Sequence, residues 1–550
     1  MSDSGQGLVF LPLGGCGEIG MNLSLYGCDG EWLMVDLGVS FGDDASPGVE
    51  LFMADPRFIE ERRDRLRGLV LTHAHEDHLG AVAYLWPRLR CPVYATAFTA
   101  ALLRDKLVEA GLLGEVPIAE VAPGQRIALG GFEVELVRMT HSLPEPNALA
   151  IRTRYGTVVH SGDWKLDAEP LIGATADEER LRAIGDQGVL ALTCDSTNIL
   201  VAEPIPSERL VRDRFHEIFP GYRGRIAVAC FATNVARLES VALAAAASGR
   251  EVAAIGRSLR RIERIARATG YLGGVAPFLD EKGAARLPPE RLVALVTGSQ
   301  GEPRAALTRI AQNAYPNFSL DEGDVVVFSS RIIPGNEIAI GRLHNALLRK
   351  GVEVVTERDH FVHVSGHPGQ CEVRRLYALL RPAAVVPIHG ELMHLRHHAA
   401  FAKSCGVAAV EVVENGDMLR LAPGAPAVVD HVLNGRLVLD GGRLRPFASR
   451  ALRERRRLAR DGALVVTLVM GGGSRLAALP QVSALGLLDE GDGDDRAAVA
   501  EAVRAAVDNL PPVVREDDEA VREAARLSAR RWVERRIGRK PPTEVHLVRL

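Results

Sequence analysis

The segment at residues 72–80 (THAHEDHLG) constrains the fold and chemistry of this chain more than any other feature. It places three histidines and an aspartate within six positions, directly after the apolar run 69–71, which predicts a buried strand. Imidazole and carboxylate groups are ligands of zinc and manganese, and a loop leaving a strand can direct alternate side chains at two adjacent metals. A structural zinc site would more often contain closely spaced cysteines, and a solvated loop with chance histidines is the alternative. The pattern therefore predicts a two-metal site that uses His73, His75, Asp77 and His78.

The length and composition limit the classes of protein to consider. A chain of 550 residues is expected to form two to four domains. Its formal charge of −4 gives no general attraction to nucleic acid, so a polyanionic partner would need a local basic channel or metal ions. The seven cysteines are scattered and fit reduced thiols. Residues 1–7 lack the features of a signal peptide, and no apolar run approaches the ~20 residues of a membrane span, so we expect a cytoplasmic protein without a membrane partner.

The order of predicted elements indicates a layered α/β architecture in the first part of the chain. Residues 8–40 alternate short apolar runs with glycine turns and predict a β-meander. A helix is expected over residues 79–86, ending before Pro87. Strands are expected at 132–139, 148–154 and 156–160, and alternating strands and helices are typical of layered α/β folds.

Two further regions differ in pattern. Residues 207–354 predict a second, doubly wound α/β unit, inserted into the first, with strands at 225–230, 251–255, 292–297 and 324–329. The last part predicts a small α+β domain, with strands at 463–470 and 544–550 and helices at 496–509 and 518–536. The resulting domain prediction is 1–206, 207–354, 355–447 and 448–550.

Three downstream residues can complete the metal site. His141, Asp163 and His389 each follow a predicted strand, and sites in α/β proteins gather at the carboxyl ends of strands. Taken alone, either histidine would more often be structural, and Asp163 could be an ordinary turn aspartate. Taken with the histidine cluster, they are expected to be ligands, and the Asp163 carboxylate can bridge two ions with one oxygen to each.

The order of these motifs resembles that of the metallo-β-lactamase fold. More narrowly the chain is similar to the β-CASP branch and, within it, to the ribonuclease J family. The resemblance rests on residues 72–80, 140–142, 162–167, 194–198, 329–336, 363–368 and 387–391. It implies an αββα sandwich with an inserted doubly wound β-CASP domain and a small α+β C-terminal domain. The histidine at 389 matches RNA-directed members, since DNA-directed members tend to have valine there.

The resemblance also implies how the ligands divide. One metal would be held by His73, His75 and His141. The other would be held by Asp77, His78 and His389, with Asp163 bridging. We expect two divalent ions per chain, with zinc preferred to manganese, although both metals accept these ligands.

A two-metal site of this kind is suited to the hydrolysis of a phosphodiester bond. Two adjacent cations can lower the pKa of a shared water, and the resulting hydroxide can attack phosphorus in line. His367 is the candidate proton donor, and the alternative is that it only binds phosphate. Asp195 could hold His367 in position, or could cap the next helix.

A 5′-phosphate site is expected close by. Ser365, Gly366 and His367 precede a predicted helix at 369–380, and free N–H groups at such a junction can bind an anion. In the resembled enzymes this region accepts a 5′-monophosphate. Arg331 is a further candidate contact, although a plain surface arginine is the alternative. Two basic clusters could each be a solvated helix face or line a channel for the RNA backbone: one at residues 257–267 and one that consists of Arg531, Arg535, Arg536, Arg539 and Lys540. The spacing of Arg257, Arg260, Arg261 and Arg264 places them on one helix face, so the first cluster is the better candidate.

The predicted function is that of a metal-dependent ribonuclease acting on single-stranded RNA in RNA maturation and mRNA decay. It would degrade 5′-monophosphorylated RNA from 5′ to 3′ and also cut internally, with His367, Asp195 and Asp77 as catalytic residues. A homodimer or homotetramer through the C-terminal domain is expected from the resemblance. The alternatives are a small-molecule thioester or lactam hydrolase of the same fold and a catalytically silent RNA-binding subunit.

Overall fold

The computed structural model describes residues 6–42, 46–333, 335–489 and 491–550. Pro334, part of the motif at 329–336, and residues 1–5, part of the segment assessed for a signal peptide, lie outside the described residues. The chain forms two compact units: one comprises the chain up to Ser40 with Met53–Gly435, and the other comprises Phe41–Phe52 with Arg436–Leu550. In the described ranges no helix is both long enough and apolar enough to cross a bilayer.

The first unit is built around two facing sheets. The first sheet has the order β24-β23-β1-β3-β4-β7-β8-β9, and the second has the order β10-β11-β12-β13-β14-β20-β22. The strands of the first are β1 (Leu8–Gly14), β3 (Leu23–Cys28), β4 (Glu31–Val35), β7 (Leu66–Val70), β8 (Val93–Ala95), β9 (Ile118–Glu120), β23 (Asp417–Ala422) and β24 (Ala427–His431). Those of the second are β10 (Arg126–Leu129), β11 (Phe132–Arg138), β12 (Asn147–Thr153), β13 (Gly156–His160), β14 (Ala191–Asp195), β20 (Ala384–Ile388) and β22 (Ala409–Val410).

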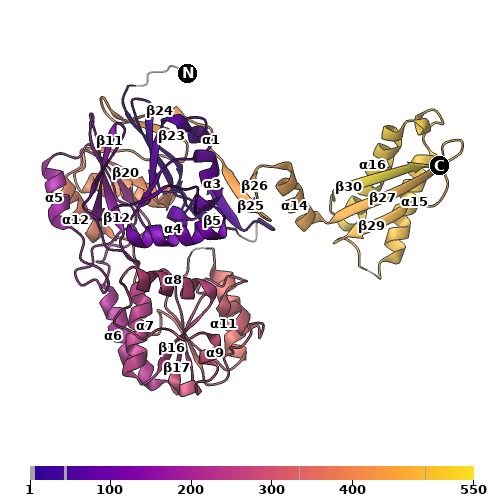
Figure 1. Ribbon diagram of the computed structural model, residues 1–550. Coiled ribbons are helices and arrows are strands. Elements are labelled where there is room, and N and C mark those ends of the chain that lie inside the picture. The colour runs from indigo at the N-terminus through magenta and orange to yellow at the C-terminus, as the bar shows by residue number, and fades with distance from the viewer. Residues whose placement is uncertain (1–5, 43–45, 334, 490) are drawn as a thin grey trace. The chain divides into compact units, whose positions relative to one another are not determined.

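Apolar side chains hold these layers together. The facing surfaces of the two sheets share one core, to which Phe10 and Leu33 of the first sheet and Leu149 and Val386 of the second belong. A second core joins the outer face of the second sheet to helices, and Figure 1 shows these helices outside the sheet. The predicted αββα sandwich is thus confirmed. The helices of these layers are α1 (Arg57–Glu60), α2 (Glu76–Leu79), α3 (Val82–Leu89), α4 (Ala97–Glu109), α5 (Glu178–Asp186), α12 (Gln370–Leu380) and α13 (Leu392–Ser404).

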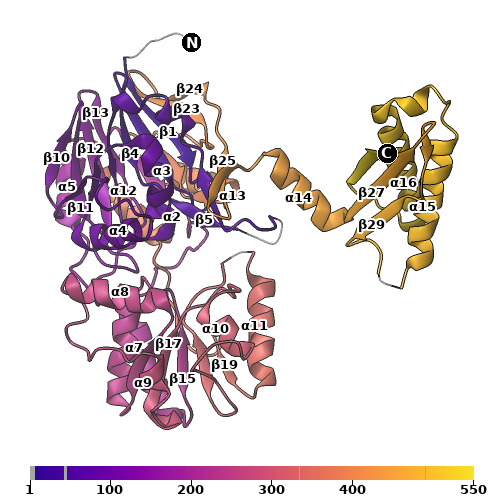
Figure 2. The same ribbon diagram turned by 45° about the vertical axis from the view of Figure 1, so that its right-hand side comes forward.

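The first unit also contains the predicted inserted domain. Its five strands are all parallel, because each is joined to the next by a helical crossover. Helices lie on both sides of this sheet (Figures 1 and 2), as expected for a doubly wound fold. In sheet order the strands are β16 (Glu251–Ile255), β17 (Leu292–Val296), β15 (Ile226–Ala229), β18 (Val325–Phe328) and β19 (Glu353–Val355), with α6 (Glu208–Ile218), α7 (Val235–Ala247), α8 (Arg257–Ala268), α9 (Glu281–Ala284), α10 (Ala306–Ala311) and α11 (Glu337–Arg349).

The second unit contains the predicted α+β domain. Strand β27 pairs with β29 in antiparallel and with β30 in parallel fashion, and apolar residues of this sheet share a core with two long helices. A further sheet has the order β26-β25-β6-β5. Strands β5 (Val39–Phe41) and β6 (Leu51–Ala54) each include residues of both units. The other elements are β25 (Arg436–Asp440), β26 (Arg443–Pro446), α14 (Arg450–Asp461), β27 (Ala463–Gly471), β28 (Arg475–Leu476), β29 (Gln481–Leu485), α15 (Gly493–Asp508), α16 (Asp518–Ile537) and β30 (Thr543–Arg549).

One predicted helix end was wrong. Helix α3 does not stop before Pro87 but continues through it to Leu89. Leu85 and Leu89 are both buried on the same side of this helix. The packing of this apolar face outweighs the one hydrogen bond that the proline cannot donate.

A fully buried arginine joins three segments of the inserted domain. The Arg237 guanidinium on α7 is paired with the Glu208 carboxylate on α6, where one of the N–O distances is 2.9 Å. The same guanidinium donates to the carbonyl oxygens of Ser329 at 2.8 Å and Val362 at 3.3 Å. Val362 lies on the segment that returns to the sandwich and leads to His367, so this ion pair fixes the start of that segment.

Replacement of Arg237 by methionine is expected to destabilise the first unit by about 3–5 kcal/mol, because it leaves the Glu208 carboxylate buried without its partner. Denaturant unfolding would measure this loss as a lower midpoint. Arg209→Met on α6, next to Glu208, is the control, since the Arg209 side chain is 54% exposed and surface ion pairs contribute ~0–1 kcal/mol. Equal unfolding midpoints for the two variants would contradict the proposed role of the buried pair.

Candidate metal centre

The structure brings all seven predicted ligands together. Their donor atoms form two groups, and within each group the atoms lie within 4.8 Å of one another. Asp163 belongs to both groups, which matches the division into two sites with one bridging carboxylate. The first group is His73, His75, His141 and Asp163, and the second is Asp77, His78, Asp163 and His389.

The topology explains this convergence. Residues 72–78 follow β7, His141 follows β11, Asp163 follows β13 and His389 follows β20. Strands β13, β14 and β20 are parallel neighbours, so the residues after them emerge at one edge of the second sheet. Strand β7 ends at the corresponding edge of the facing sheet, and the ligands meet between the two edges.

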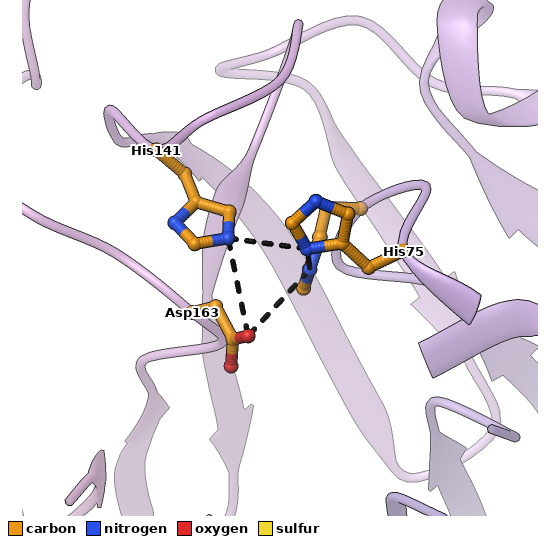
Figure 3. Close-up of side chains that lie close together, drawn as sticks. His75, His141 and Asp163 are labelled. Carbon is orange, nitrogen blue, oxygen red and sulfur yellow. Dashed lines mark hydrogen bonds and ion pairs between the residues drawn. The ribbon is translucent and has the colours of Figure 1, made fainter. Parts of the chain in front are cut away.

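In the first group the ring nitrogens are in close contact. His75 Nδ1 lies 3.1 Å from His73 Nε2 and 3.2 Å from His141 Nε2. Asp163 Oδ2 lies 3.7 Å from His73 Nε2 and 4.0 Å from His141 Nε2. Figure 3 shows His75 and His141 pointing toward each other and toward the Asp163 carboxylate.

The second group uses the same carboxylate oxygen, so Asp163 faces both groups through Oδ2 and not, as expected, with one oxygen toward each. Asp163 Oδ2 lies 3.2 Å from His78 Nε2 and 3.4 Å from His389 Nε2. Asp77 Oδ2 lies 3.5 Å and 3.6 Å from the same two nitrogens. Asp163 is 3% exposed, so its charge is directed at the buried side chains of the site and not at solvent.

Oxygen atoms fix the outer nitrogen of several rings. Asp36 Oδ2 lies 2.7 Å from His78 Nδ1, and Asn22 Oδ1 lies 3.1 Å from His389 Nδ1. The Gly366 carbonyl lies 2.6 Å from His141 Nδ1. Histidine ligands of metals are typically oriented in this way. Asp36 and Asn22 could not be recognised as contacts of the ligands from the sequence pattern, apart from the position of Asp36 directly after β4, the apolar strand next to β7.

This arrangement fits bound cations. When the outer nitrogens of His78, His141 and His389 donate to these oxygens, their inner Nε2 atoms carry lone pairs that point into the two ligand groups, where they can bind a cation. Burial lowers the pKa of His141 to about 3 and holds the pKa of His73 and His75 well below the usual value. Neutral imidazole is the form that binds metal. Five imidazoles and two carboxylates are a donor set for divalent ions such as zinc or manganese.

His367 and Asp195 form a pair at the border of this site. His367 Nδ1 lies 2.8 Å from Asp195 Oδ2 and 3.9 Å from Asp163 Oδ2. Burial disfavours the charged ring, but the Asp195 carboxylate raises the pKa of His367 to about 9. The other Asp195 oxygen accepts the Thr197 N–H at 2.9 Å. Asp195 therefore contacts His367 and caps a turn, and the alternative role as a helix cap is not what the structure shows.

The predicted phosphate-binding turn is tied to the ligands. A side chain at Gly366 would place its Cβ 2.6 Å from the His141 ring, so only glycine fits beside this ligand. The Ser365 hydroxyl accepts the Asn198 side-chain amide at 2.6 Å and the His367 N–H at 3.2 Å. Ser365, Gly366 and His367 are thus brought together as predicted.

The predicted anion site at the start of the following helix is not free. The Gly369 N–H donates to the Glu372 carboxylate at 3.0 Å, and the Gln370 N–H donates to the Val201 carbonyl at 2.9 Å. A carboxylate at this position also repels an anion. Arg331 is exposed and makes no described contact with the ligands. Burial, together with the charges of Arg237 and Arg331, lowers the pKa of His363 to about 3.

The arginines of α8 differ from expectation. Arg261 pairs with Asp105 and Glu109 of α4, and Arg264 pairs with Asp105. Two of the four predicted channel residues thus hold the inserted domain against the sandwich and do not stand free for RNA. The helices α4 and α8 lie side by side in Figures 1 and 2.

Comparison with known proteins places the chain in a family. It is 44% identical to ribonuclease J of Sinorhizobium meliloti, over 99% of this chain and 97% of that protein. It is 38% identical to ribonuclease J of Mycolicibacterium smegmatis, over 98% of both chains. The chain belongs to the ribonuclease J family. A further family member, ribonuclease J2 of Bacillus subtilis, is 33% identical over 84% of both chains.

Four family models match parts of this chain. Residues 43–182 match the beta-lactamase superfamily domain and residues 223–347 match the ribonuclease J beta-CASP domain. Residues 351–410 match the Zn-dependent metallo-hydrolase RNA specificity domain, and 450–550 match the ribonuclease J C-terminal domain. A crystal structure of an Enterococcus faecalis protein of unknown function has the same fold, with a TM-score of 0.52 at 17% identity, over 75% of this chain and all of that one.

Proposed function

We propose that this ribonuclease J family member hydrolyses the phosphodiester bonds of single-stranded RNA. It acts from the 5′ end, favours a 5′-monophosphate and also cuts internally. The observation that carries the proposal is the shared position of Asp163 Oδ2, which faces both groups of ligands at 3.2–4.0 Å. A small-molecule hydrolase would not need the inserted domain, and a silent subunit would not need seven intact donors.

The seven ligands have defined roles in this proposal. His73, His75 and His141 hold one divalent ion, and Asp77, His78 and His389 hold the other, with zinc preferred to manganese. Two such ions would supply Lewis acidity and a water of lowered pKa beside the scissile phosphate. Asp36, Asn22 and the Gly366 carbonyl keep the ligand rings in the orientation that this requires.

In this proposal His367 protonates the leaving group. Its Nδ1 is occupied by Asp195, so its Nε2–H is the proton that it can give to the leaving ribose oxygen. Asp195 is a positioning residue, because it acts on the substrate only through this ring. Arg331 and the protonated His367 supply positive charge for the terminal phosphate. Ser365 and Gly366 form the turn that places His367 beside the metal ligands.

We also propose a cellular location, a domain division and an oligomeric state for this chain. All seven cysteines are free, which suits a reducing cytoplasm and a role in RNA maturation and mRNA decay. The division we propose is a sandwich from residues 1–206 and 355–447, a β-CASP domain at 207–354 and a C-terminal domain at 448–550. The last of these would assemble the chain into a homodimer or homotetramer.

The preference for 5′ ends has a direct test. We expect 5′-monophosphorylated RNA to be degraded at least about tenfold faster than the same RNA with a 5′-triphosphate, which corresponds to ~1.4 kcal/mol of discrimination. End-labelled RNA of each kind, with zinc or manganese added, provides the measurement. Equal rates on both ends would contradict the 5′-end preference, and thioester hydrolysis without RNA cleavage would contradict the ribonuclease proposal itself.

A further inference from the structure

Helix α14 is unusually basic for a chain whose net charge is −4. Its twelve residues contain six arginines against two acids, Glu454 and Asp461, which leaves four positive charges. Among its side chains Leu452 is buried, whereas most of the arginines are exposed. The helix is labelled in Figures 1 and 2.

One side of α14 packs within its own unit. Leu452 is 3% exposed. The Arg455 guanidinium makes two contacts with the Asp440 carboxylate, at 2.9 and 3.1 Å. The Arg456 guanidinium lies 4.6 Å from the centre of the Phe447 ring. These three residues anchor the helix and account for two of its six arginines.

The other four arginines form a stripe. Arg450, Arg453, Arg457 and Arg460 follow one another at spacings of three, four and three residues, which places them on one face of a helix. All four are exposed, and the side chains of Arg450 and Arg460 are 85% and 75% exposed. We refer to these four residues as the α14 stripe.

The partners of the stripe leave half of its charge uncompensated. Arg450 pairs with Glu454, and Arg460 pairs with Asp461. Arg453 donates only to the Ala448 carbonyl, and Arg457 has no ion pair among the residues that the structure describes. Helix α8 has the same net charge, but its Arg260, Arg261 and Arg264 pair with acids on other elements. The stripe has no such structural role.

We propose that the α14 stripe binds the phosphate backbone of RNA, as a contact separate from the metal centre. This inference rests on the proposed function, because it assumes that RNA is the substrate. The guanidinium group matches phosphate with paired N–H donors, and backbone contacts of this kind carry no sequence preference. At 1.5 Å per residue the stripe is ~15 Å long, which spans roughly four phosphates of a stacked strand at 3.4 Å.

The composition of the helix favours RNA over a membrane surface. A helix that lies in a bilayer interface needs a broad exposed apolar face. The large exposed apolar side chain of α14 is Leu458 alone, at 43% exposure. The remaining exposed positions are arginine, alanine and a partly exposed glutamate, so the surface is suited to a solvated polyanion.

A binding experiment on the full chain tests this inference. The stripe variant carries Arg450→Gln, Arg453→Gln, Arg457→Gln and Arg460→Gln, and glutamine keeps the helix propensity. The control variant carries Arg504→Gln, Arg522→Gln, Arg526→Gln and Arg536→Gln on α15 and α16, where each arginine pairs with a carboxylate. Fluorescence anisotropy with a 40-nucleotide RNA in a chelator measures Kd as a function of salt, and circular dichroism checks the fold of both variants.

We expect the stripe variant to bind the 40-nucleotide RNA at least about tenfold more weakly than the parent chain, with a salt slope reduced by roughly two to three, since each single-strand contact contributes ~0.7. The control variant should bind like the parent. Hydrolysis of a four-nucleotide 5′-monophosphorylated RNA should be unchanged in kcat/KM in both variants.

Other results would overturn the inference. A stripe variant with unchanged Kd and salt slope contradicts it, as does an equal loss in the control variant or an equal loss of activity on the four-nucleotide RNA. If the stripe variant lost binding to anionic vesicles but kept full RNA binding, the α14 stripe would be a membrane-binding surface and not an RNA-binding one. Failure of the proposed function appears separately, as a parent chain that binds RNA but does not cleave it.

Discussion

Replacing Asp163 with alanine is expected to lower kcat/KM on RNA by about 10³-fold or more. One oxygen of this carboxylate faces four histidines of the two ligand groups, at 3.2–4.0 Å. Its loss removes the shared ligand and leaves His73, His75 and His141 without a carboxylate in their group. Even the loss of a residue that only orients a metal ligand typically costs 10–100-fold, so the bridging ligand should cost more. Cleavage of end-labelled RNA under single-turnover conditions gives the measurement.

Asp186→Ala is a suitable control for this variant. Asp186 lies in the same unit, but its side chain is 67% exposed and pairs with Arg381 on the surface. Its replacement should leave both the rate and the unfolding midpoint close to those of the parent chain. Retention of more than about a tenth of the activity by Asp163→Ala would be incompatible with a bridging role.

The second large effect is expected at His367. His367→Ala should lower kcat by about 10²–10⁴-fold, which is the usual contribution of a positioned proton donor. Asp195→Asn should lower kcat less, by roughly 10–100-fold, because the ring remains but is held less firmly. The double variant should be little slower than His367→Ala, since the two residues act as a unit.

The kinetic constants kcat and KM distinguish proton donation by His367 from phosphate binding alone. If His367 only binds phosphate, its loss should raise KM and leave kcat unchanged. If it donates the proton, kcat falls and KM changes little. The His367→Ala chain should also keep its full content of bound metal, unlike Asp163→Ala. A change confined to KM would assign His367 to phosphate binding.

Much of the fold follows from local patterns in the sequence. The strands at 156–160 and 251–255 have their predicted bounds, because each is a short apolar run between a glycine turn or charged residue and a change of pattern. The ligands could be predicted for a related reason. Each lies within eight residues after the end of a strand, so its place near a sheet edge is set largely by that strand.

The parts that the sequence did not predict depend on tertiary neighbours. Asp36 reaches His78 only because β4 and β7 are parallel neighbours, which the sequence does not state. Gly366 is required by the His141 ring, and Glu372 occupies the helix start that was expected to bind phosphate. The α8 arginines are paired with α4, an element more than a hundred residues earlier in the chain.

The metal content of the full chain tests the central claim most directly. After removal of metal with a chelator and reconstitution with zinc or manganese, inductively coupled plasma mass spectrometry should find two ions per chain. Ribonuclease activity should be absent before reconstitution and should return as the second ion binds. A chain that binds fewer than two ions at saturation, or one that cleaves RNA at its full rate after complete removal of metal, would contradict a binuclear centre built from these seven residues.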